Sequence, residues 1–406
     1  GQVVSQYTDR CNAACNQGGM RRTERFERRT RDQNAVRRLI DTLAEKGVAA
    51  ISFTGGEPLL CLEEIAPLME HAGRAGIRSI RTGTNGFLFM GADRLDFVPR
   101  MHHLAETLAR TPLNTFWISL DSASPEVHET NRGLPGVVAG IEKALPILAQ
   151  YDIFPAANLG INRHTGGNGD ATLRTGANGD FDPAAFHFAA RQAFARFYAF
   201  VGSLGFTTVN ACYPMSLDPA EAATGAVYAA TSTDDFIHFR PEEKAVLFQA
   251  LLDTIPIFRP RLRIFTPRSS LLALIRQYQG QPERSYPCRG GIDFFFVDSR
   301  DMQAYPCGYR GAESLGRLED LDLTSLKNEA FCRQCDWECF RDPSELVGPL
   351  LDLFRRPLAL AGKLLRDREF TALWLQDLRY YRACDWFNAR RAPDMRKLAG
   401  FGPRGV

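Results

Sequence analysis

The sequence predicts an α/β fold built on a parallel sheet. Short apolar, β-branched runs alternate with longer segments of helical periodicity about six times over the first 215 residues or so. Strands that alternate with helices at this spacing are joined by right-handed crossovers and therefore run parallel. Polar or glycine-rich residues follow four of the predicted strands. Ligands of such sheets bind beyond the carboxyl ends of the strands, so these residues are candidates for one shared site.

The predicted strands are short runs rich in apolar and β-branched residues: Val3–Tyr7, Val48–Phe53, Arg78–Thr82, Thr115–Asp121, Pro155–Ile161, Thr207–Cys212 and, much later, Ile292–Asp298. Apolar residues three and four positions apart predict helices over about Val36–Leu43, Leu62–Ala75, Leu95–Arg110, Leu134–Tyr151 and Phe186–Leu204. The Gly- and Asn-rich stretch Thr165–Gly179 is predicted to be a loop. Past residue 343 the chain is again helical, with Leu-rich runs flanked by Arg and Lys.

The composition is that of a globular protein: 45% of the 406 residues are hydrophobic, 24% are charged, and the formal net charge is +2. This balance gives no reason to expect a nucleic-acid partner. No apolar run approaches the roughly 20 residues that a membrane span needs, and no segment resembles a signal peptide. Because no signal peptide is recognised, we expect a cytoplasmic protein. In that reducing compartment the ten cysteines favour metal binding over disulfides. Since the chain begins at Gly1 rather than Met, we also expect the sequence to be trimmed.

Four groups of residues that carry chemistry follow predicted strands. The first holds Cys11 and Cys15, whose thiolates suit iron or zinc, although a pair four residues apart is by itself a weak signal. The others, each an ordinary turn or helix cap when taken singly, are Gly55-Gly56-Glu57-Pro58, Thr84-Asn85-Gly86 and Ser119-Leu120-Asp121. Their convergence on one edge of the sheet is the strongest indication of a site.

In order and spacing these motifs, together with His128–Gly133, resemble the radical S-adenosylmethionine (SAM) superfamily up to about residue 215. The resemblance implies a partial (β/α)6 TIM-like barrel. It implies that Cys11 and Cys15 bind a 4Fe–4S cluster, and that Gly56 and Glu57 meet the amino group of SAM. The other residues implied to line the cofactor are Gly55, Pro58, Thr84, Asn85, Ser119, Asp121 and either Asn158 or Asn162.

The sequence departs from the family pattern at Gly18, where the CxxxCxxC motif has its third cysteine. Glycine has no side chain and cannot bind iron. One interpretation is that a Cys-to-Gly change has impaired the site. A second is that a water or a residue from elsewhere, such as Asp9, Gln17 or Cys61, completes the cluster, and a third is that the cluster is absent and the barrel only binds. The first is favoured, because the surrounding motifs are those of an active enzyme's pocket.

A second group of cysteines lies near the C-terminus: Cys288, Cys307, Cys332, Cys335 and Cys339. A hairpin that brings Cys288 near Cys307, closed by the CxxC of Cys332 and Cys335, would make a four-thiolate cage that suits zinc and iron–sulfur equally. The pattern also resembles the twitch and SPASM extensions of radical SAM enzymes. That resemblance implies an auxiliary 4Fe–4S cluster on these four, with Cys339 as an extra thiol or in place of Cys332 or Cys335.

The remaining cysteines, Cys61, Cys212 and Cys384, are predicted to be small buried hydrophobes. We predict a core barrel over residues 1–235, a helical connector over 236–285, a twitch/SPASM-like auxiliary cluster domain over 286–342 and C-terminal helices over 343–406. The helices are expected to cap the barrel or form a dimer face, and peripheral membrane contact is a further interpretation.

The function expected from the resemblance is reductive cleavage of SAM to a 5′-deoxyadenosyl radical, which abstracts hydrogen from a small-molecule or peptide substrate. Electrons would come from a donor such as flavodoxin or ferredoxin. The rival hypothesis is a non-catalytic SAM-binding or zinc-knuckle scaffold protein. The motifs assign no catalytic residue beyond those that hold the cofactors.

Overall fold

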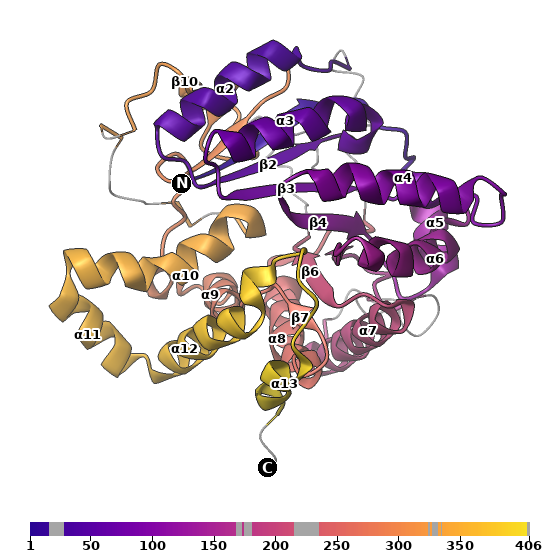
Figure 1. The fold of residues 1–406 in the computed structure, drawn as a ribbon. Helices are drawn as coiled ribbons and strands as arrows, with labels where there is room; N and C mark the ends of the chain where they lie inside the picture. The colour runs from indigo at the N-terminus through magenta and orange to yellow at the C-terminus, as the bar shows by residue number, and fades with distance from the viewer. Residues whose placement is uncertain are drawn as a thin grey trace.

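The computed structural model describes residues 1–15, 28–167, 173, 181–214, 235–323, 325–326, 332–333 and 335–403. Gly18 and most of the predicted loop Thr165–Gly179 lie outside these ranges. Within them, ten strands form one curved sheet in the order β10-β9-β8-β1-β2-β3-β4-β5-β6-β7 (Figure 1). The two ends of this order do not pair, so the barrel is open.

Eight neighbouring strands are parallel: β8 (Phe294–Val297), β1 (Gln2–Thr8), β2 (Ala50–Gly55), β3 (Ser79–Thr84), β4 (Leu113–Ser119), β5 (Ala156–Gly160), β6 (Thr208–Cys212) and β7 (Arg263–Ile264). Antiparallel β9 (Gln303–Tyr305) and β10 (Gly316–Arg317) extend the β8 edge. The six predicted barrel strands are thus all present, in sequence order. The structure adds β7, which lies inside the connector that was expected to be helical.

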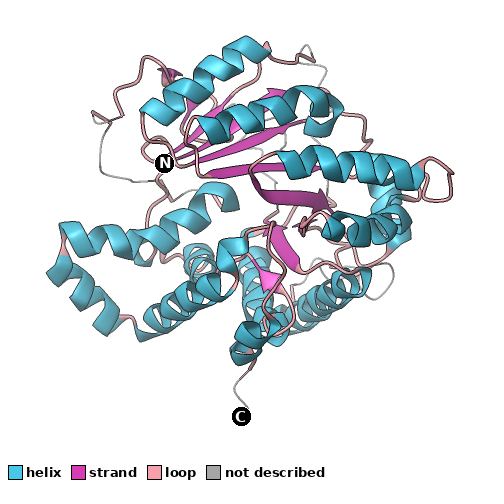
Figure 2. Cartoon of the chain, in the orientation of Figure 1, coloured by secondary structure: helices cyan, strands magenta, loops and turns pink. Residues whose placement is uncertain are grey.

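The barrel helices are α2 (Gln33–Glu45), α3 (Leu62–Arg74), α4 (Phe97–Arg110), α5 (Pro125–Arg132), α6 (Val137–Gln150) and α7 (Pro183–Leu204). They are followed by α8 (Pro241–Phe258), α9 (Arg268–Tyr278), α10 (Glu338–Arg355), α11 (Pro357–Arg366), α12 (Arg368–Ala383) and α13 (Met395–Leu398). Figure 2 shows the helices wrapped around the outside of the sheet, with α10 to α12 gathered on one side.

Local sequence explains why these helices form, as α2 illustrates. The Asp32 side chain caps the helix by accepting a hydrogen bond from the Ala35 N–H over 2.8 Å. The helix ends just before Gly47, whose φ of +70° is one that glycine adopts without strain. Its buried residues are Val36, Leu39, Ile40 and Leu43, which form one apolar stripe.

Alternate residues of the strands give the sheet two different faces. The outer face is apolar, and it packs under the helices through residues such as Ile51, Phe53, Ile80, Phe116 and Leu159, all fully buried. The inner face, defined here by the residues in between, is mostly polar: Gln2, Ser52, Arg81, Thr115, Trp117, Ser119, Asn158, Asn210 and Cys212. The apolar core therefore positions a polar surface inside the open barrel.

The inner face becomes apolar only toward β8. There Val4, Phe294 and Phe296 form a separate cluster with Trp337 and Phe340, at the start of α10. Two of the C-terminal cysteines, Cys288 and Cys307, belong to the same cluster. The cysteine-rich segment and the first turn of α10 thus pack directly on the inside of the barrel sheet.

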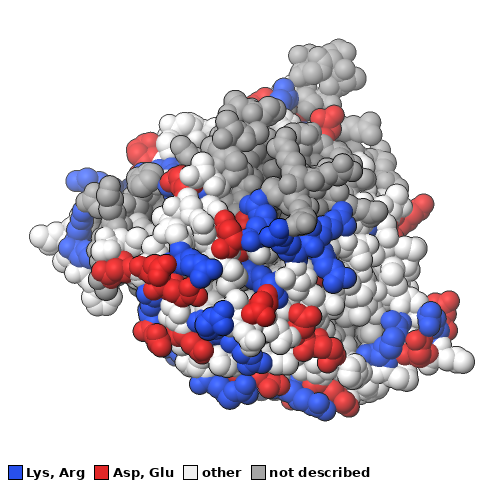
Figure 3. Space-filling model, turned by 90° about the horizontal axis from the view of Figure 1, so that it is seen from above, with Lys and Arg blue, Asp and Glu red and all other residues white. Residues whose placement is uncertain are grey.

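The outer surface mixes both signs of charge. Seen from above, where α2 and α3 lie, basic and acidic side chains are interspersed, with one group of basic side chains in the middle (Figure 3). Several large apolar side chains are exposed on α10 and α11: Leu353, Phe354, Leu358 and Leu365. None of the described helices combines the length and the apolar character that a membrane crossing needs.

Candidate functional site

The end of β2 lies directly against the segment that leads into the cysteine loop. The backbone N–H groups of Gly56 and Glu57 donate to the carbonyl oxygens of Thr8 and Arg10, each over 2.8 Å. A Cβ atom at Gly56 would lie 2.3 Å from the Arg10 oxygen, and one at Gly55 would lie 2.2 Å from the Thr8 oxygen. Only glycine permits this approach, so the Gly-Gly pair determines where the cysteine loop begins.

Glu57 joins the ends of β2 and β3. Its fully buried carboxylate accepts hydrogen bonds from the backbone N–H of Leu59 over 3.0 Å and of Asn85 over 2.5 Å. Burial raises the pKa of Glu57 to about 7, although these bonds and one from the Thr84 side chain oppose the shift. Pro58, next along the chain, is buried at the first position of a short 3₁₀ turn. The carboxylate therefore holds two strand ends together.

Asn85 reaches from the end of β3 to the cysteine loop. Its Nδ2 donates to the Asn12 side-chain oxygen over 2.9 Å and lies 3.9 Å from the Cys11 sulfur. Its Oδ1 accepts from the Phe87 backbone N–H over 2.9 Å, which fixes the orientation of the amide. The predicted neighbours Cys11 and Asn85 thus lie side by side.

Cys15 is held at the end of β4 by α5. The Arg132 guanidinium donates to both carboxylate oxygens of Asp121, over 2.6 and 3.0 Å, and its Nη1 lies 4.0 Å from the Cys15 sulfur. The Ala14 N–H donates to the Arg132 carbonyl over 2.7 Å. Burial would raise the pKa of Asp121, but the Arg132 cation holds it below its usual value. Burial raises the pKa of the Cys15 thiol, and Arg132 opposes that shift.

His128 of α5 also contacts Asp121 at the end of β4. Its ring is fully buried, and Nδ1 accepts a hydrogen bond from the Asp121 backbone N–H over 3.1 Å. Burial lowers the pKa of His128 to about 4, so the ring is neutral with its proton on Nε2. That Nε2 is buried and has no hydrogen-bond partner in the described part of the chain.

The two predicted asparagines on the fifth strand differ in their surroundings. Ser119, Asn158 and Asn210 form one row across β4, β5 and β6, and Asn210 donates to the Asn158 side chain over 2.8 Å. Asn162 lies beyond the strand, where its Nδ2 donates to two backbone carbonyls over 2.8 Å each. Its Oδ1 accepts from the His164 N–H over 2.7 Å. Asn158 therefore faces the inner side of the barrel, whereas Asn162 shapes its own loop.

The structure brings together most residues that the sequence singled out at this edge of the sheet, but it does not supply a third iron ligand among the described residues. Asp9 accepts hydrogen bonds from Gln6 and Ser299, over 2.7 and 2.5 Å. Cys61 is buried beside Glu64. Neither side chain forms a hydrogen bond with Cys11 or Cys15, although the Asp9 Oδ2 atom is left without a hydrogen-bond partner in the described part of the chain. Gln17, the other candidate, lies outside the described residues.

Sequence reasoning gave no role to Asn12, Arg132 or His128. The motif that contains the last two was recognised, but their contacts with Cys15 and Asp121 depend on where α5 sits. One signal was available in the sequence. An aspartate that ends a buried strand needs a cation, and Arg132 is the nearest arginine that follows it in the chain.

Four of the five C-terminal cysteines line one small cavity: Cys288, Cys307, Cys332 and Cys335, together with Trp337 and Phe340. The Cys288 N–H donates to the Cys332 carbonyl over 2.8 Å. A Cβ at Gly290 would lie 2.5 Å from the Pro306 oxygen, so this glycine lets the Cys307 loop approach. Burial, with Cys288 and Cys332 nearby, raises the pKa of Cys307 to about 12. A metal cation would reverse that shift, since it binds thiolates.

Cys339 lies apart from this cage. It stands in the first turn of α10, where its thiol faces the Glu338 carboxyl over 3.5 Å. The other groups that affect its pKa, after burial and Glu338, are Cys212 and Arg81 of the inner face. Cys212 thus makes polar contacts with Glu338 and Asn158. The prediction that three cysteines are small buried hydrophobes therefore holds for Cys61 and Cys384 but is wrong for Cys212.

No three His, Cys, Asp or Glu side chains of the described residues are placed to hold a single metal ion. The four thiols surround a cavity instead.

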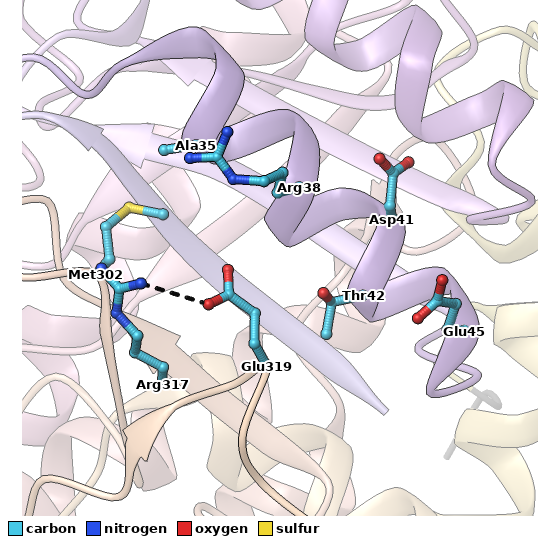
Figure 4. A pocket seen from close by; sticks show the side chains of 8 residues that line it. All are labelled: Ala35, Arg38, Asp41, Thr42, Glu45, Met302, Arg317 and Glu319. Carbon is cyan, nitrogen blue, oxygen red and sulfur yellow. Dashed lines mark ion pairs between the residues drawn. The ribbon is translucent and has the colours of Figure 1, made fainter.

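A larger hollow of about 330 Å³ lies outside the barrel, between α2 and the β10 edge (Figure 4). It is lined by Arg38, Asp41 and Glu45 from α2, and by the Arg317–Glu319 ion pair. Its charges are mixed, and it is remote from the strand ends that carry the cysteine loop.

Comparisons with known proteins agree with this geometry. Residues 5–170 match the family model of the radical SAM superfamily. An AdoMet-dependent heme synthase of Oleidesulfovibrio alaskensis is 28% identical over 349 residues, which are 85% of this chain and 78% of that protein. A GTP 3′,8-cyclase of Desulforamulus reducens is 30% identical over 165 residues, which are 39% of this chain and 46% of that protein.

Two solved structures have a similar fold. SuiB of Streptococcus suis, bound to S-adenosylmethionine, has a TM-score of 0.51 and 13% identity, over 80% of this chain and 64% of SuiB. The structure of anSMEcpe with bound AdoMet and a peptide has a TM-score of 0.50 and 16% identity, over 81% of this chain and 80% of that one. At these identities the likeness concerns the fold alone.

Proposed function

We propose that this chain, whose residues 5–170 form a radical SAM domain, is an enzyme that binds SAM at the carboxyl ends of β1 to β5 and cleaves it reductively. The observation that carries the proposal is that both N-terminal thiols lie at the carboxyl ends of the strands: Cys11 contacts Asn85 after β3, and Cys15 contacts Arg132 of α5, which pairs with Asp121 after β4. Cys11 and Cys15 would hold the iron–sulfur cluster, which would supply the electron for SAM cleavage and so start hydrogen abstraction from a substrate.

The proposed roles of the residues follow from their contacts. Cys11 and Cys15 bind iron, while the Gly55–Pro58 turn brings backbone close to the SAM amino group. Glu57 keeps the ends of β2 and β3 together and so maintains that turn. Asn85, Ser119 and Asn158 provide polar groups for the methionyl and ribose parts, and the Asp121–Arg132 pair fixes Cys15.

The ligand set of this cluster is incomplete as the sequence stands, because two thiolates are present where the family pattern has three. We infer that Gly18 limits cluster loading and hence SAM cleavage. The intact surroundings favour this inference, since the Gly-Gly turn, the buried Glu57 and the Asp121–Arg132 pair all remain in place.

The test is the variant Gly18→Cys, purified without oxygen and reconstituted with iron and sulfide. We expect about four more bound irons per chain, and 5′-deoxyadenosine on addition of SAM and a strong reductant. Gly18→Ser is the matched control, because it adds a side chain of similar size without a thiolate. Unchanged iron together with unchanged SAM cleavage in Gly18→Cys would contradict the proposal.

We further propose that Cys288, Cys307, Cys332 and Cys335 bind an auxiliary 4Fe–4S cluster. Their shared cavity on the inner side of the sheet supports this, because a cluster there would adjoin the interior of the barrel. Iron, sulfide and zinc assays on the anaerobically purified protein test it. Zinc without sulfide would favour the scaffold hypothesis instead.

The substrate class proposed from the relatives remains a small molecule or a peptide: one relative is named for heme synthesis, and one similar structure holds a peptide. An electron donor such as flavodoxin or ferredoxin is part of the same proposal. If the C-terminal helices meet a membrane surface, the exposed Leu and Phe side chains of α10 and α11 are the residues that would do so.

A further inference from the structure

Arg81 lies on the inner face, and no acidic residue in the described part of the chain pairs with it. It lies on β3, in register with Ser52 of β2 and Thr115 of β4. Its Nε donates to the Ser79 hydroxyl over 3.2 Å, and its Nη1 donates to the Gln2 side-chain oxygen over 3.4 Å. Both contacts are long and the acceptors are neutral, so the guanidinium fork lacks a strong acceptor.

Several arginines of the protein pair directly with an acid, although the buried Arg263 bonds only to backbone carbonyls and a hydroxyl. The pairs Arg132–Asp121, Arg259–Asp377 and Arg276–Asp367 each have a nitrogen–oxygen distance of 2.6 Å. Burial lowers the pKa of Arg81, and the groups that oppose this shift are the Cys339 thiol and the Tyr381 phenol. No Asp or Glu of the described residues forms an ion pair with Arg81.

Trp117 provides a second hydrogen-bond donor on the same face. It lies on β4 in register with Gly83, two residues after Arg81 on β3. A Cβ at Gly83 would lie 3.2 Å from the Trp117 Cβ, so the absence of a side chain there makes room for the tryptophan. The indole Nε1–H is buried and has no acceptor among the described residues. Buried donors without partners are costly, and a ligand that supplies acceptors relieves the cost.

These donors lie between the strand ends that carry the cysteine loop and the Cys339 thiol of α10. Toward the carboxyl ends of the strands, the inner face continues through Ser119 and Asn158. On the opposite side, Cys339 brings the first turn of α10 to Arg81. The Glu338 carboxyl contacts the thiols of Cys339 and Cys212 and forms no ion pair with Arg81. A substrate bound inside the barrel would meet the guanidinium.

The surroundings of Arg81 also limit which anionic group it can bind, a carboxylate or a phosphate. A guanidinium fork matches a planar carboxylate with two parallel hydrogen bonds. A phosphate dianion usually has more than one cation or a nest of backbone N–H groups around it. Arg81 is the one cation among the inner-face residues named above, so this set of side chains offers a single positive charge.

We propose that the substrate carries a carboxylate, which Arg81 binds on the inner face with the Trp117 N–H as a further donor. This inference rests on the proposed function, because it assigns the substrate class of the same barrel. Its test measures binding alone and needs no SAM cleavage. The inference about the substrate and the proposed function can therefore fail separately.

The probes are benzoate, benzamide and phenyl phosphate, which share a ring and differ in the group presented to Arg81. Ligand-observed NMR measures their binding to the full chain as purified. Benzoate is expected to bind at least about tenfold more tightly than benzamide, and Arg81→Gln should remove that preference. Arg78→Gln is the matched control, because this arginine is exposed three residues earlier in the chain and should leave the preference unchanged.

Thermal unfolding separates a ligand-binding role from a structural one. If Arg81 serves a ligand, Arg81→Gln keeps or raises the unfolding midpoint, because a buried cation without an anion has been removed. A lowered midpoint would mean that Arg81 supports the fold. The proposal is also overturned if phenyl phosphate binds more tightly than benzoate, if benzamide binds as well as benzoate, or if none of the probes binds.

Discussion

Gly56 sets how closely the cysteine loop can approach β2. In Gly56→Ala the new methyl group would lie 2.3 Å from the Arg10 carbonyl oxygen, so the loop has to move. In the Gly18→Cys background we expect Gly56→Ala to lose the iron bound by Cys11 and Cys15, with a stability cost of about 1–3 kcal/mol. Iron per chain and urea unfolding measure both effects.

The control for this prediction is Gly362→Ala. Gly362 lies within α11, and a Cβ there would have no atom within 4 Å. Its substitution should leave iron binding unchanged and stabilise the helix by up to about 1 kcal/mol. If both alanine variants retain the same iron, the close backbone approach at Gly56 is not what positions the loop.

His128 predicts a pH dependence of stability. Its folded-state pKa of about 4 lies below the ordinary value of 6.5, so the folded protein binds fewer protons than the unfolded chain between these values. This group's stabilisation is complete above pH 6.5 and is lost as the pH falls toward 4. Between pH 7.5 and 5 it amounts to about 2 kcal/mol.

The variant His128→Asn removes the titrating ring but keeps a side-chain acceptor for the Asp121 N–H. Urea unfolding at both pH values should show a smaller acid-induced loss in the variant than in the parent protein. All other titrating groups are common to the two proteins, so the difference isolates His128. Equal losses would mean that the histidine is not buried in its neutral form.

At the scale of single residues, the sequence predicts positions at strand ends better than it predicts contacts. The proximity of Asn85 to Cys11 follows from strand order, because both lie where parallel strands end. The contact of Arg132 with Cys15 does not, since it depends on the orientation of α5. Only the structure reveals that Arg81 has no ion pair with a described Asp or Glu, because the absence of an ion pair has no signature in sequence.

Among the elements, α10 explains why five nearby cysteines do not form one group. The segment before it places Cys335 in the four-thiol cavity, and four residues later the first helical turn carries Cys339 to Arg81 and Cys212. We therefore expect Cys335→Ser to lose the auxiliary cluster and Cys339→Ser to keep it. Iron and sulfide per chain, with the visible absorption of the cluster, measure the difference. Loss of the cluster in both variants would make Cys339 a ligand.

Element prediction was accurate where periodicity is strong. Helix α6 was expected over Leu134–Tyr151 and spans Val137–Gln150, because its apolar stripe is continuous. Strand β7 was missed, since its two residues owe their strand conformation to pairing with β6 rather than to their own pattern. Helix α5 was missed as well, because its eight mostly polar residues have no long apolar stripe.

On the scale of the whole molecule, the cysteine-rich segment shares the sheet of the barrel. Strand β8 pairs in parallel with β1 over Gln2–Ser5, and its inner-face phenylalanines pack with Val4. The proposed boundary at residue 286 therefore separates sequence segments whose backbones are hydrogen-bonded to each other. The sequence predicted the strand but not its partner, because parallel pairing between residues almost 300 apart leaves no local pattern.

This shared sheet predicts how the protein responds to loss of the proposed auxiliary cluster. Removing the cluster by Cys335→Ser should lower the thermal midpoint of the whole chain by about 5 °C or more, in a single transition. Loosening β8 would expose the edge of β1, which is an interior strand of the ten-stranded sheet. Calorimetry would resolve two transitions, with the larger one unshifted, if the cysteine-rich segment folded independently. Cys384→Ser, at a buried cysteine outside both thiol groups, is the control for the loss of a sulfur atom alone.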